Sequence, residues 1–423
     1  MATIIRTALQ LQAMSGDLTA DYELGSDIDC TGMAAWNGGL GFVPVGTYTL
    51  GVPADAFSGS FDGKNYKIID FSCTRPLLDH IGLFGYTLAS GEIKNVTFED
   101  CTISGDYAVG PLVAFVGVGS GKISNCHSTG TVAGRMLAGG LIGYNLSELE
   151  DCHSDCVCTF AATGIDDAVQ CGGLIGLDVT AVGVTRCYAT GDITVTSDDD
   201  VHEIGGFAGY SVNKLFSECF ASGDISVTAG GQGYSIGGFI GSCGGVDGIY
   251  NSFSTGDVVV VVVDNSKGWV GGFIGQNNGA IMENCYSAGL VDETAGQPDI
   301  GGFCGEDIGG TFNDCFWDTQ TSGQAASDGG TGKTTAQMKS SDTFSAVGWP
   351  LSTIWYVLSG CNNGYPCLIN VQACCQPPPA DETIVGDKVT LEAIRNIEFV
   401  YGGRFYIDKS GNAVYESRYH RNV

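Results

Sequence analysis

Cysteine is the residue type in this chain whose number and spacing could most readily do chemistry. The chain has 18 cysteines, and several recur at one position of an internal repeat: Cys126, Cys152, Cys187, Cys219, Cys285 and Cys315. Regularly spaced thiols could form disulfides or bind a metal ion. One copy of the repeat has Ser252 at this position, which keeps the small size but loses the sulfur. We therefore expect a structural ladder of small inward side chains, in which free cysteine packs as a compact hydrophobic residue.

A second group, Cys152, His153, Cys156 and Cys158, has the residue types of a zinc site. Its spacing matches no common zinc pattern, and Cys156 and Cys158 alternate as residues on one face of a strand do. His127 and His153 stand where other copies of the repeat have an aromatic residue: Tyr188, Phe220, Phe253 and Tyr286. They are most simply members of the same aromatic position.

Clustered carboxylates are the remaining candidates for a metal site. Asp198, Asp199 and Asp200 are consecutive, and Asp166 and Asp167 form a shorter cluster one repeat earlier. Carboxylate oxygens are the ligands that calcium prefers, so calcium binding is possible here. Both clusters fall between the repeated motifs, where a solvated loop is the simpler interpretation.

No catalytic pattern emerges from the rest of the chain. The run Gly329–Thr334 resembles the end of a phosphate-binding loop, but that pattern needs glycine five positions before Gly332, where Ser327 stands. The spacing of the five histidines supports no Ser-His-Asp or Cys-His arrangement. We expect no enzyme activity and no bound cofactor.

The element that must position these side chains is a repeat of about thirty residues. A block of two glycines, two mostly apolar residues and a further glycine recurs, and its second glycines are Gly140, Gly173, Gly206, Gly238, Gly272 and Gly302. Measured from Gly82 and Pro111 in two degenerate copies, successive spacings are 29, 29, 33, 33, 32, 34 and 30 residues. The cysteine block, for example Cys187-Tyr188-Ala189-Thr190-Gly191, keeps the same period. Two interlocked motifs at one period indicate a solenoid.

Each repeat contains short apolar runs bounded by Gly, Asn and Asp, which predict strands and turns. A single coil cannot bury its apolar side, whereas stacked coils share a continuous core. We therefore predict an all-β fold, a parallel β-helix or β-solenoid of about eight coils with terminal caps. The glycines would allow positive φ at corners and close approach between coils.

These blocks resemble the GLUG repeat of bacterial and phage-associated surface proteins. The N-terminal phrases Leu11–Met14, Tyr22–Leu24, Asp27–Cys30 and Phe57–Gly63 are similar to those that open such solenoids. The resemblance covers roughly residues 5–370. It implies a structural module, and it implies no catalytic residues.

Changes in residue composition and motif content along the chain predict its domain organisation. We predict an N-terminal cap and first coils over 1–80, the repeat solenoid over 81–320, and a C-terminal cap over 321–375. A proline-rich linker follows at 376–381, and a small α+β module at 382–423. Within that module, the segment 402–418 resembles part of phage tail proteins.

Charge and hydropathy limit the classes of partner that the chain could bind. The net charge of −29 disfavours nucleic acid and anionic membranes. The longest apolar run, Val258–Val263, is too short to span a bilayer, and the N-terminal residues show no signal-type cleavage site.

We expect a structural or adhesive component of a phage tail or extracellular fibre, located on a virion or outside the cell. The alternatives are a bacterial surface adhesin and, less favoured, a polysaccharide-active enzyme. The expected partners are a surface receptor or glycan, together with copies of the chain itself, because solenoid ends and the Val258–Val263 strand would offer free edges.

Overall fold

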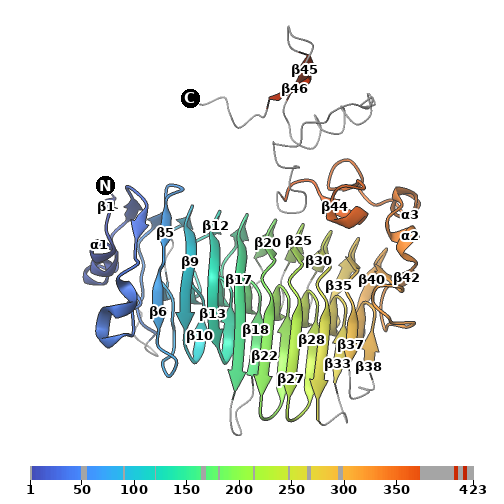
Figure 1. The fold of residues 1–423 in the computed structure, drawn as a ribbon, viewed down its shortest axis with the longest axis horizontal. Coiled ribbons are helices and arrows are strands. Elements are labelled where there is room, and N and C mark those ends of the chain that lie inside the picture. The colour runs from blue at the N-terminus through green and yellow to red at the C-terminus, as the bar shows by residue number, and fades with distance from the viewer. Residues whose placement is uncertain are drawn as a thin grey trace.

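The computed structural model describes residues 2–371, apart from 49–54, 89–90, 120, 163–167, 180–181, 213–214, 246–247, 264–267 and 294–298, together with the strands at 404–407 and 413–416. The chain forms a nearly all-β parallel solenoid of about seven turns (Figure 1). The predicted fold class is therefore confirmed, with slightly fewer coils than the eight expected.

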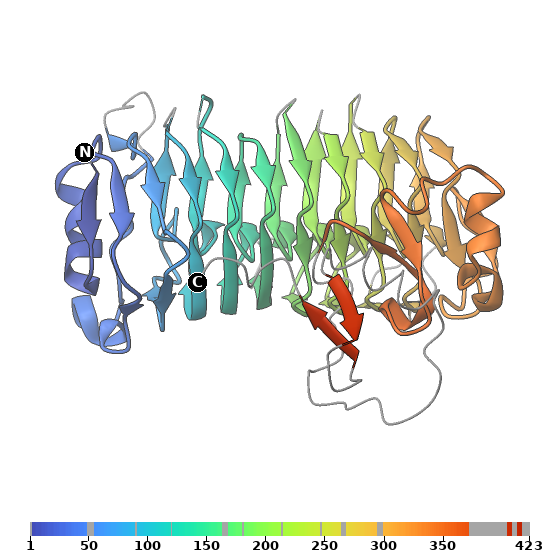
Figure 2. The same cartoon turned by 90° about the horizontal axis from the view of Figure 1, so that it is seen from above.

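Four long parallel sheets, here called A to D, run along the solenoid. One coil passes from sheet A to B, then to D, then to C, and on to sheet A of the next coil. All pairings between their strands are parallel and join residues of adjacent coils; Thr194, for example, pairs with Ser226. Figure 2 shows the strands of successive coils side by side along the rod.

Sheet A contains β1 (Thr3–Ile5), β2 (Tyr22–Leu24), β4 (Phe61–Asp62), β8 (Ile93–Lys94), β12 (Ile123–Ser124), β16 (Leu149–Glu150), β20 (Gly183–Thr185), β25 (Leu215–Ser217), β30 (Gly248–Tyr250), β35 (Ile281–Glu283) and β40 (Thr311–Asn313). Sheet B contains β3 (Ile28–Asp29), β5 (Lys67–Ile69), β6 (Ser72–Thr74), β9 (Thr97–Ser104), β13 (His127–Gly134), β17 (His153–Ala162), β21 (Tyr188–Ala189), β22 (Ile193–Ser197), β26 (Phe220–Ala221), β27 (Ile225–Ala229), β31 (Phe253–Ser254), β32 (Val258–Val262), β36 (Tyr286–Ser287), β37 (Val291–Glu293), β41 (Phe316–Asp318) and β42 (Thr331–Lys333).

Sheet C contains β7 (Phe84–Thr87), β11 (Val113–Val116), β15 (Ile142–Asn145), β19 (Ile175–Asp178), β24 (Ala208–Val212), β29 (Ile240–Gly244), β34 (Ile274–Asn278) and β39 (Cys304–Asp307). Sheet D contains β10 (Tyr107–Val109), β14 (Met136–Gly139), β18 (Ala168–Gly172), β23 (Val201–Gly205), β28 (Gly233–Gly237), β33 (Trp269–Gly271) and β38 (Asp299–Gly301).

The core is built from columns of identical or similar side chains. Along β22, Ile193 and Val195 are buried while Thr194 and Thr196 are exposed, the alternation of a strand with one buried face. The first apolar residue of the glycine block gives a column of stacked rings. Phe207, Phe239, Phe273 and Phe303 have ring centroids 4.8, 4.9 and 4.8 Å apart. This spacing is that of neighbouring strands in a sheet.

The glycine block allows sheets D and C to meet without side chains between them. A Cβ on Gly206 would lie 2.2 Å from the carbonyl oxygen of Gly238 in the next coil, and one on Gly209 would lie 2.5 Å from the backbone nitrogen of Cys171. Gly140, Gly173, Gly238 and Gly272 make the same carbonyl approach, at 2.1 to 2.3 Å, and Gly302 packs against the Trp317 ring. None of these second glycines has positive φ. Their function is therefore close approach alone, and the expected use at positive-φ corners is wrong for this block.

Positive φ occurs instead at non-glycine residues, within sheet D strands such as β14 and β23 (Leu137 and Glu203) and at the corner between sheets A and B. One residue in each of the following coils is left-handed there, with φ between 49° and 56°: Asn125, Asp151, Arg186, Glu218, Asn251, Asn284 and Asp314. Asn and Asp tolerate this conformation better than other non-glycine residues, which explains their frequency just before the cysteine position.

The valine-rich strand β32 lies inside sheet B. It pairs with β27 on one side and with β37 on the other. The expectation that Val258–Val263 offers a free edge is therefore wrong for Val258–Val260, because both neighbouring coils pair with these residues.

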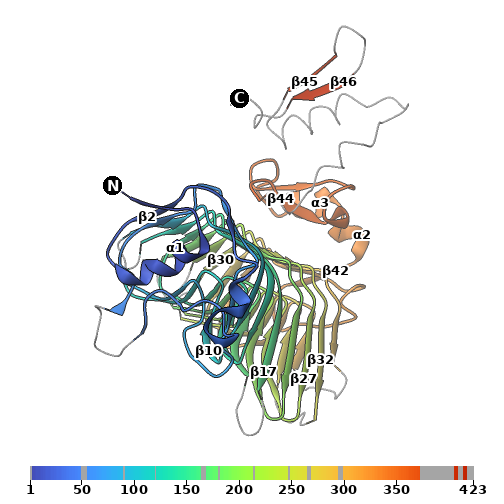
Figure 3. The ribbon, with the colours of Figure 1, turned by 60° about the vertical axis from the view of Figure 1, so that its left-hand side comes forward.

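Both ends of the solenoid are covered. At the N-terminal end lie helix α1 (Ala8–Ala13) and the short 3-10 helices η1 (Met14–Gly16) and η2 (Met33–Gly38) (Figure 3). Thr7 caps α1 by accepting a hydrogen bond from the backbone of Gln10, and Leu11 is buried in the core.

The C-terminal cap contains α2 (Thr335–Met338), α3 (Ser341–Ser345), β43 (Trp355–Val357), η4 (Asn362–Gly364) and β44 (Pro366–Leu368). A capping box between Thr334 and Gln337 begins α2. Of the predicted C-terminal module, the structure describes an antiparallel hairpin of β45 (Arg404–Ile407) and β46 (Ala413–Glu416). The predicted linker and helix of that module lie outside the described residues.

Candidate functional site

The six repeated cysteines lie at equivalent places in successive coils, between a sheet A strand and a sheet B strand. Around Cys187 and Cys219, the flanking residues pair in register, Thr185 with Ser217 and Tyr188 with Phe220. The backbone nitrogen of Cys152 donates to Sγ of Cys187 at 3.4 Å. The Cys219 nitrogen donates in the same way to Oγ of Ser252 at 3.2 Å. Serine therefore takes over the position of sulfur in this ladder.

The chemistry of the ladder is that of buried free thiols. All six cysteines are buried, and none is disulfide-bonded. Burial raises the pKa of the Cys219 thiol to about 12, so little thiolate forms at this position at neutral pH. At Cys152, burial acts in the same direction, but hydrogen bonds with Cys126 and Cys187 outweigh it and lower the pKa. Among the residues that the structure describes, no group of three or more His, Cys, Asp or Glu side chains could hold a metal ion.

The second cysteine group is divided between the two faces of a strand. Cys156 and Cys158 point into the core from β17, whereas His153 belongs to the outward row of that strand. Its members therefore do not converge on one point.

Asp198, Asp199 and Asp200 form the turn between β22 and β23. Oδ1 of Asp200 accepts a hydrogen bond of 2.7 Å from the backbone nitrogen of Gln232 in the next coil. The backbone nitrogen of Asp199 donates to Ser197 Oγ at 3.1 Å. These contacts close the turn and tie it to the next one, and no third ligand group joins them in the described part of the chain. Asp166 and Asp167 lie outside the described residues.

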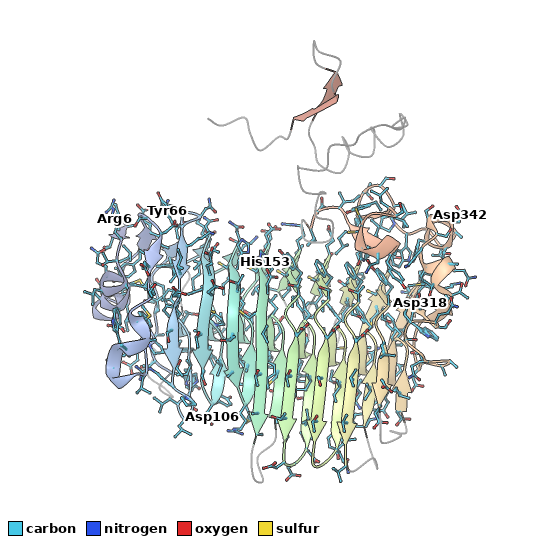
Figure 4. All side chains as sticks on the ribbon, viewed as in Figure 1. Arg6, Tyr66, Asp106, His153, Asp318 and Asp342 are labelled. Carbon is cyan, nitrogen blue, oxygen red and sulfur yellow. The ribbon has the colours of Figure 1, made fainter. Side chains whose placement is uncertain are left out.

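The outward face of sheet B carries a row of aromatic side chains that pair in register from coil to coil, here called the aromatic ladder: His127, His153, Tyr188, Phe220, Phe253, Tyr286 and Phe316. The ring centroids of the first pair are 3.8 Å apart, and the pairs from His153 to Tyr286 are 4.3 to 5.0 Å apart. His127 and His153 are thus stacked with the other aromatic side chains (His153 is labelled in Figure 4).

The C-terminal cap folds back along the solenoid and covers part of this ladder. Trp355 Nε1 donates to Asn251 Oδ1 at 3.1 Å, and the buried Tyr286 hydroxyl donates to the Pro366 carbonyl at 2.6 Å. Asn370 reaches Glu218 at 2.9 Å. The cap therefore does more than close the end of the stack. Within it, Cys361 and Cys367 are disulfide-bonded, unlike the thiols of the solenoid.

A pocket of about 750 Å³ opens at the N-terminal end of the solenoid, outside sheets C and D. Its lining includes Val43 and Pro44 from one loop, Leu78 from a second, and the side chains that do its chemistry: Tyr48, Arg75, Asp79, His80, Tyr107 and Phe115. The residues share no motif and come from separate coils, so the repeat pattern gave no signal for them.

Comparison with known proteins finds two partial relatives and leaves the family open. No protein-family model matches the chain. Halomucin of Haloquadratum walsbyi is 38% identical over 144 residues, which is 33% of this chain and 2% of halomucin. A candidate Gly-rich membrane protein of Evansella cellulosilytica is 37% identical over 115 residues, 26% of this chain and 13% of that protein. The chain thus spans only a small part of these relatives.

Among solved structures, a candidate immunoglobulin A1 protease from Bacteroides ovatus has a TM-score of 0.48 and 21% identity, covering 87% of this chain and 92% of that one. The GLUG and phage-tail resemblances stay predictions. No helix in the described part of the chain is long and apolar enough to cross a membrane.

Proposed function

We propose that this chain is a rigid structural module of an extracellular surface protein, which holds binding loops on a β-solenoid rod. The observation that carries this proposal is the unbroken core, in which the cysteine ladder and the phenylalanine column fill the interior from coil to coil. Because the interior of such a solenoid is filled by side chains, partners can bind only at its turns and outer faces.

The names of the two relatives favour a cell surface. One is halomucin, and the other is named as a membrane protein. An acidic surface with a net charge of −29 suits a soluble, exposed rod. A surface adhesin is therefore our first choice, with a receptor or glycan as its partner and self-association as a further role for the rod.

A phage tail or other extracellular fibre is the second candidate. The specific observation in its favour is the β45–β46 hairpin, which forms in the segment that resembles phage tail proteins. A polysaccharide-active enzyme is the third, and a turnover assay on acidic polysaccharides with and without calcium would test it; we expect no products.

Immunogold labelling with antibodies against the solenoid would test the location. We expect label on the outside of intact producing cells. Label confined to virus particles would favour the fibre, and label seen only after the cells are permeabilised would contradict both surface roles.

A further inference from the structure

We infer that the pocket at the N-terminal end binds a neutral glycan. The inference deepens the proposed surface function and depends on it, because only an exposed module meets extracellular glycans. The pocket volume of about 750 Å³ falls in the usual range of small-ligand sites.

Aromatic rings form the apolar side of this pocket. Tyr48 stacks on Phe115 with ring centroids 5.1 Å apart, and it makes a T-shaped contact with Tyr86 at 5.0 Å. The His80 ring lies 5.3 Å from Tyr48 and 5.9 Å from Tyr107. Tyr48 is 37% exposed and Leu78 is 50% exposed. Such rings provide apolar area for the C–H groups of a sugar while their hydroxyl groups stay available for hydrogen bonds.

Polar groups with unmet hydrogen bonds lie beside the rings. Arg75 Nε donates to the Phe42 carbonyl at 2.9 Å, whereas its Nη2 is buried without a partner. Nε2 of His80 is also buried without a partner. Buried polar atoms usually have partners, so two exceptions in one pocket point to groups that a ligand completes after a small side-chain rotation.

The same side chains exclude other ligand classes. An apolar peptide would bury the polar groups of Arg75, Asp79 and His80 without giving them hydrogen-bond partners. Each such group would then make the binding free energy less favourable through its lost hydration. An anionic glycan or nucleic acid would meet the Asp79 carboxylate and an acidic body of net charge −29. Burial lowers the pKa of His80, which keeps the imidazole neutral. A neutral sugar offers both C–H groups and hydroxyl groups, and it fits this set.

The outer face of the rod extends the pocket along the axis. Phe115 stacks on Tyr144 at 4.3 Å, and Tyr144, Leu177 and Tyr210 continue this row coil by coil on sheet C. On sheet D, Tyr107 is followed by Met136. A glycan chain of several sugars, lying parallel to the rod, would therefore contact successive coils.

Isothermal titration of the full chain with cellohexaose, mannohexaose and laminarihexaose tests this inference, with hexagalacturonate as the anionic probe. We expect at least one neutral hexasaccharide to bind with a Kd below about 1 mM, and hexagalacturonate to bind more weakly. Tyr48→Ala should weaken binding by about tenfold or more, because it removes the most exposed ring.

Tyr66→Ala is the matched control, since Tyr66 is 38% exposed and Tyr48 37%. Figure 4 shows Tyr66 at the edge of the rod opposite Asp106, the neighbour of pocket residue Tyr107. This variant should bind within twofold of the unchanged chain.

Asp79→Asn, which keeps the shape of the side chain, should also weaken binding and covers the case in which Tyr48→Ala misfolds. The inference is overturned if no neutral hexasaccharide binds at millimolar concentration, if both pocket variants bind normally, or if hexagalacturonate binds most tightly. Any of these results would leave the surface labelling unaffected.

Discussion

The Tyr365 hydroxyl donates a hydrogen bond of 2.8 Å to Oδ2 of Asp318, which lies 47 residues earlier in the chain. Asp318 is fully buried at the end of β41, at the C-terminal end of the rod (Figure 4). Its Oδ1 also accepts bonds from the backbone of Gln320 at 2.9 Å and from the Thr335 hydroxyl at 3.0 Å. One carboxylate therefore joins the last coil, the start of α2 and the returning segment of the cap.

Tyr365→Phe should lower the free energy of unfolding of the cap by about 1–3 kcal/mol, because it leaves a buried carboxylate oxygen without one of its donors. Urea unfolding followed by near-ultraviolet circular dichroism would measure this change. Tyr66→Phe, at an exposed position, is the control. Equal stability of the two variants would show that the Asp318 contact does not hold the cap.

Gly206→Ala should destabilise the solenoid by about 2–3 kcal/mol, because the new Cβ would lie 2.2 Å from a backbone oxygen of the next coil. Gly183→Ala is the matched control, since its Cβ would meet no atom closer than 3.7 Å. That substitution should be neutral or stabilise by up to about 1 kcal/mol, through the lost freedom of the unfolded chain. Thermal unfolding of both variants measures the difference, and similar midpoints would contradict the close approach between coils.

The period of the repeat was enough to predict the fold because it reports a physical constraint. Each coil must place its small, aromatic and glycine positions above those of the previous coil, so the Cys187 and Gly206 positions recur together. The same constraint explains why Ser252 can replace cysteine, since both are small and supply an acceptor to the backbone nitrogen of the previous coil.

The pocket and the path of the cap could not be predicted in this way. Tyr48, Arg75 and Tyr107 meet only because loops of different coils pack together, and no spacing along the chain expresses that contact. Trp355 lies 104 residues from Asn251, and their hydrogen bond depends on where the chain turns after the last coil. The spacing of the block glycines does not distinguish close approach from positive φ. In the structure these glycines serve close approach, and non-glycine residues such as Asn251, Asp314 and Arg186 have the positive φ.

The thiols of the solenoid should react with Ellman's reagent only as fast as the protein unfolds. Fourteen described cysteines are free and buried, and burial raises the pKa of Cys73, Cys171 and Cys219 to about 12. Burial denies the reagent access to all fourteen thiols. Thiolate is the reactive form, so the raised pKa opposes reaction further at Cys73, Cys171 and Cys219. A time course with and without urea measures this. Rapid labelling of the folded protein, or a rise in its thermal midpoint with zinc, would favour a chemical role for the ladder.

The stacked pair His127–His153 should make stability depend on pH in a window set by its own titration. Burial lowers the pKa of both histidines from 6.5 to about 4, and the charge of His153 adds to the effect on His127. Above about pH 6.5 both imidazoles are neutral in the folded and unfolded chains, so they contribute no pH dependence. As the pH falls from 6.5 to about 4, the unfolded chain binds protons that the folded stack excludes, and the free energy of unfolding decreases. Below about pH 4 the decrease levels off. The loss is at most about 3 kcal/mol for each histidine.

Replacing both by phenylalanine, the residue at the Phe220 and Phe253 positions of the same ladder, should remove this part of the slope in urea unfolding series at several pH values. A double variant with the same slope as the unchanged chain would show that these rings are not held neutral by the stack.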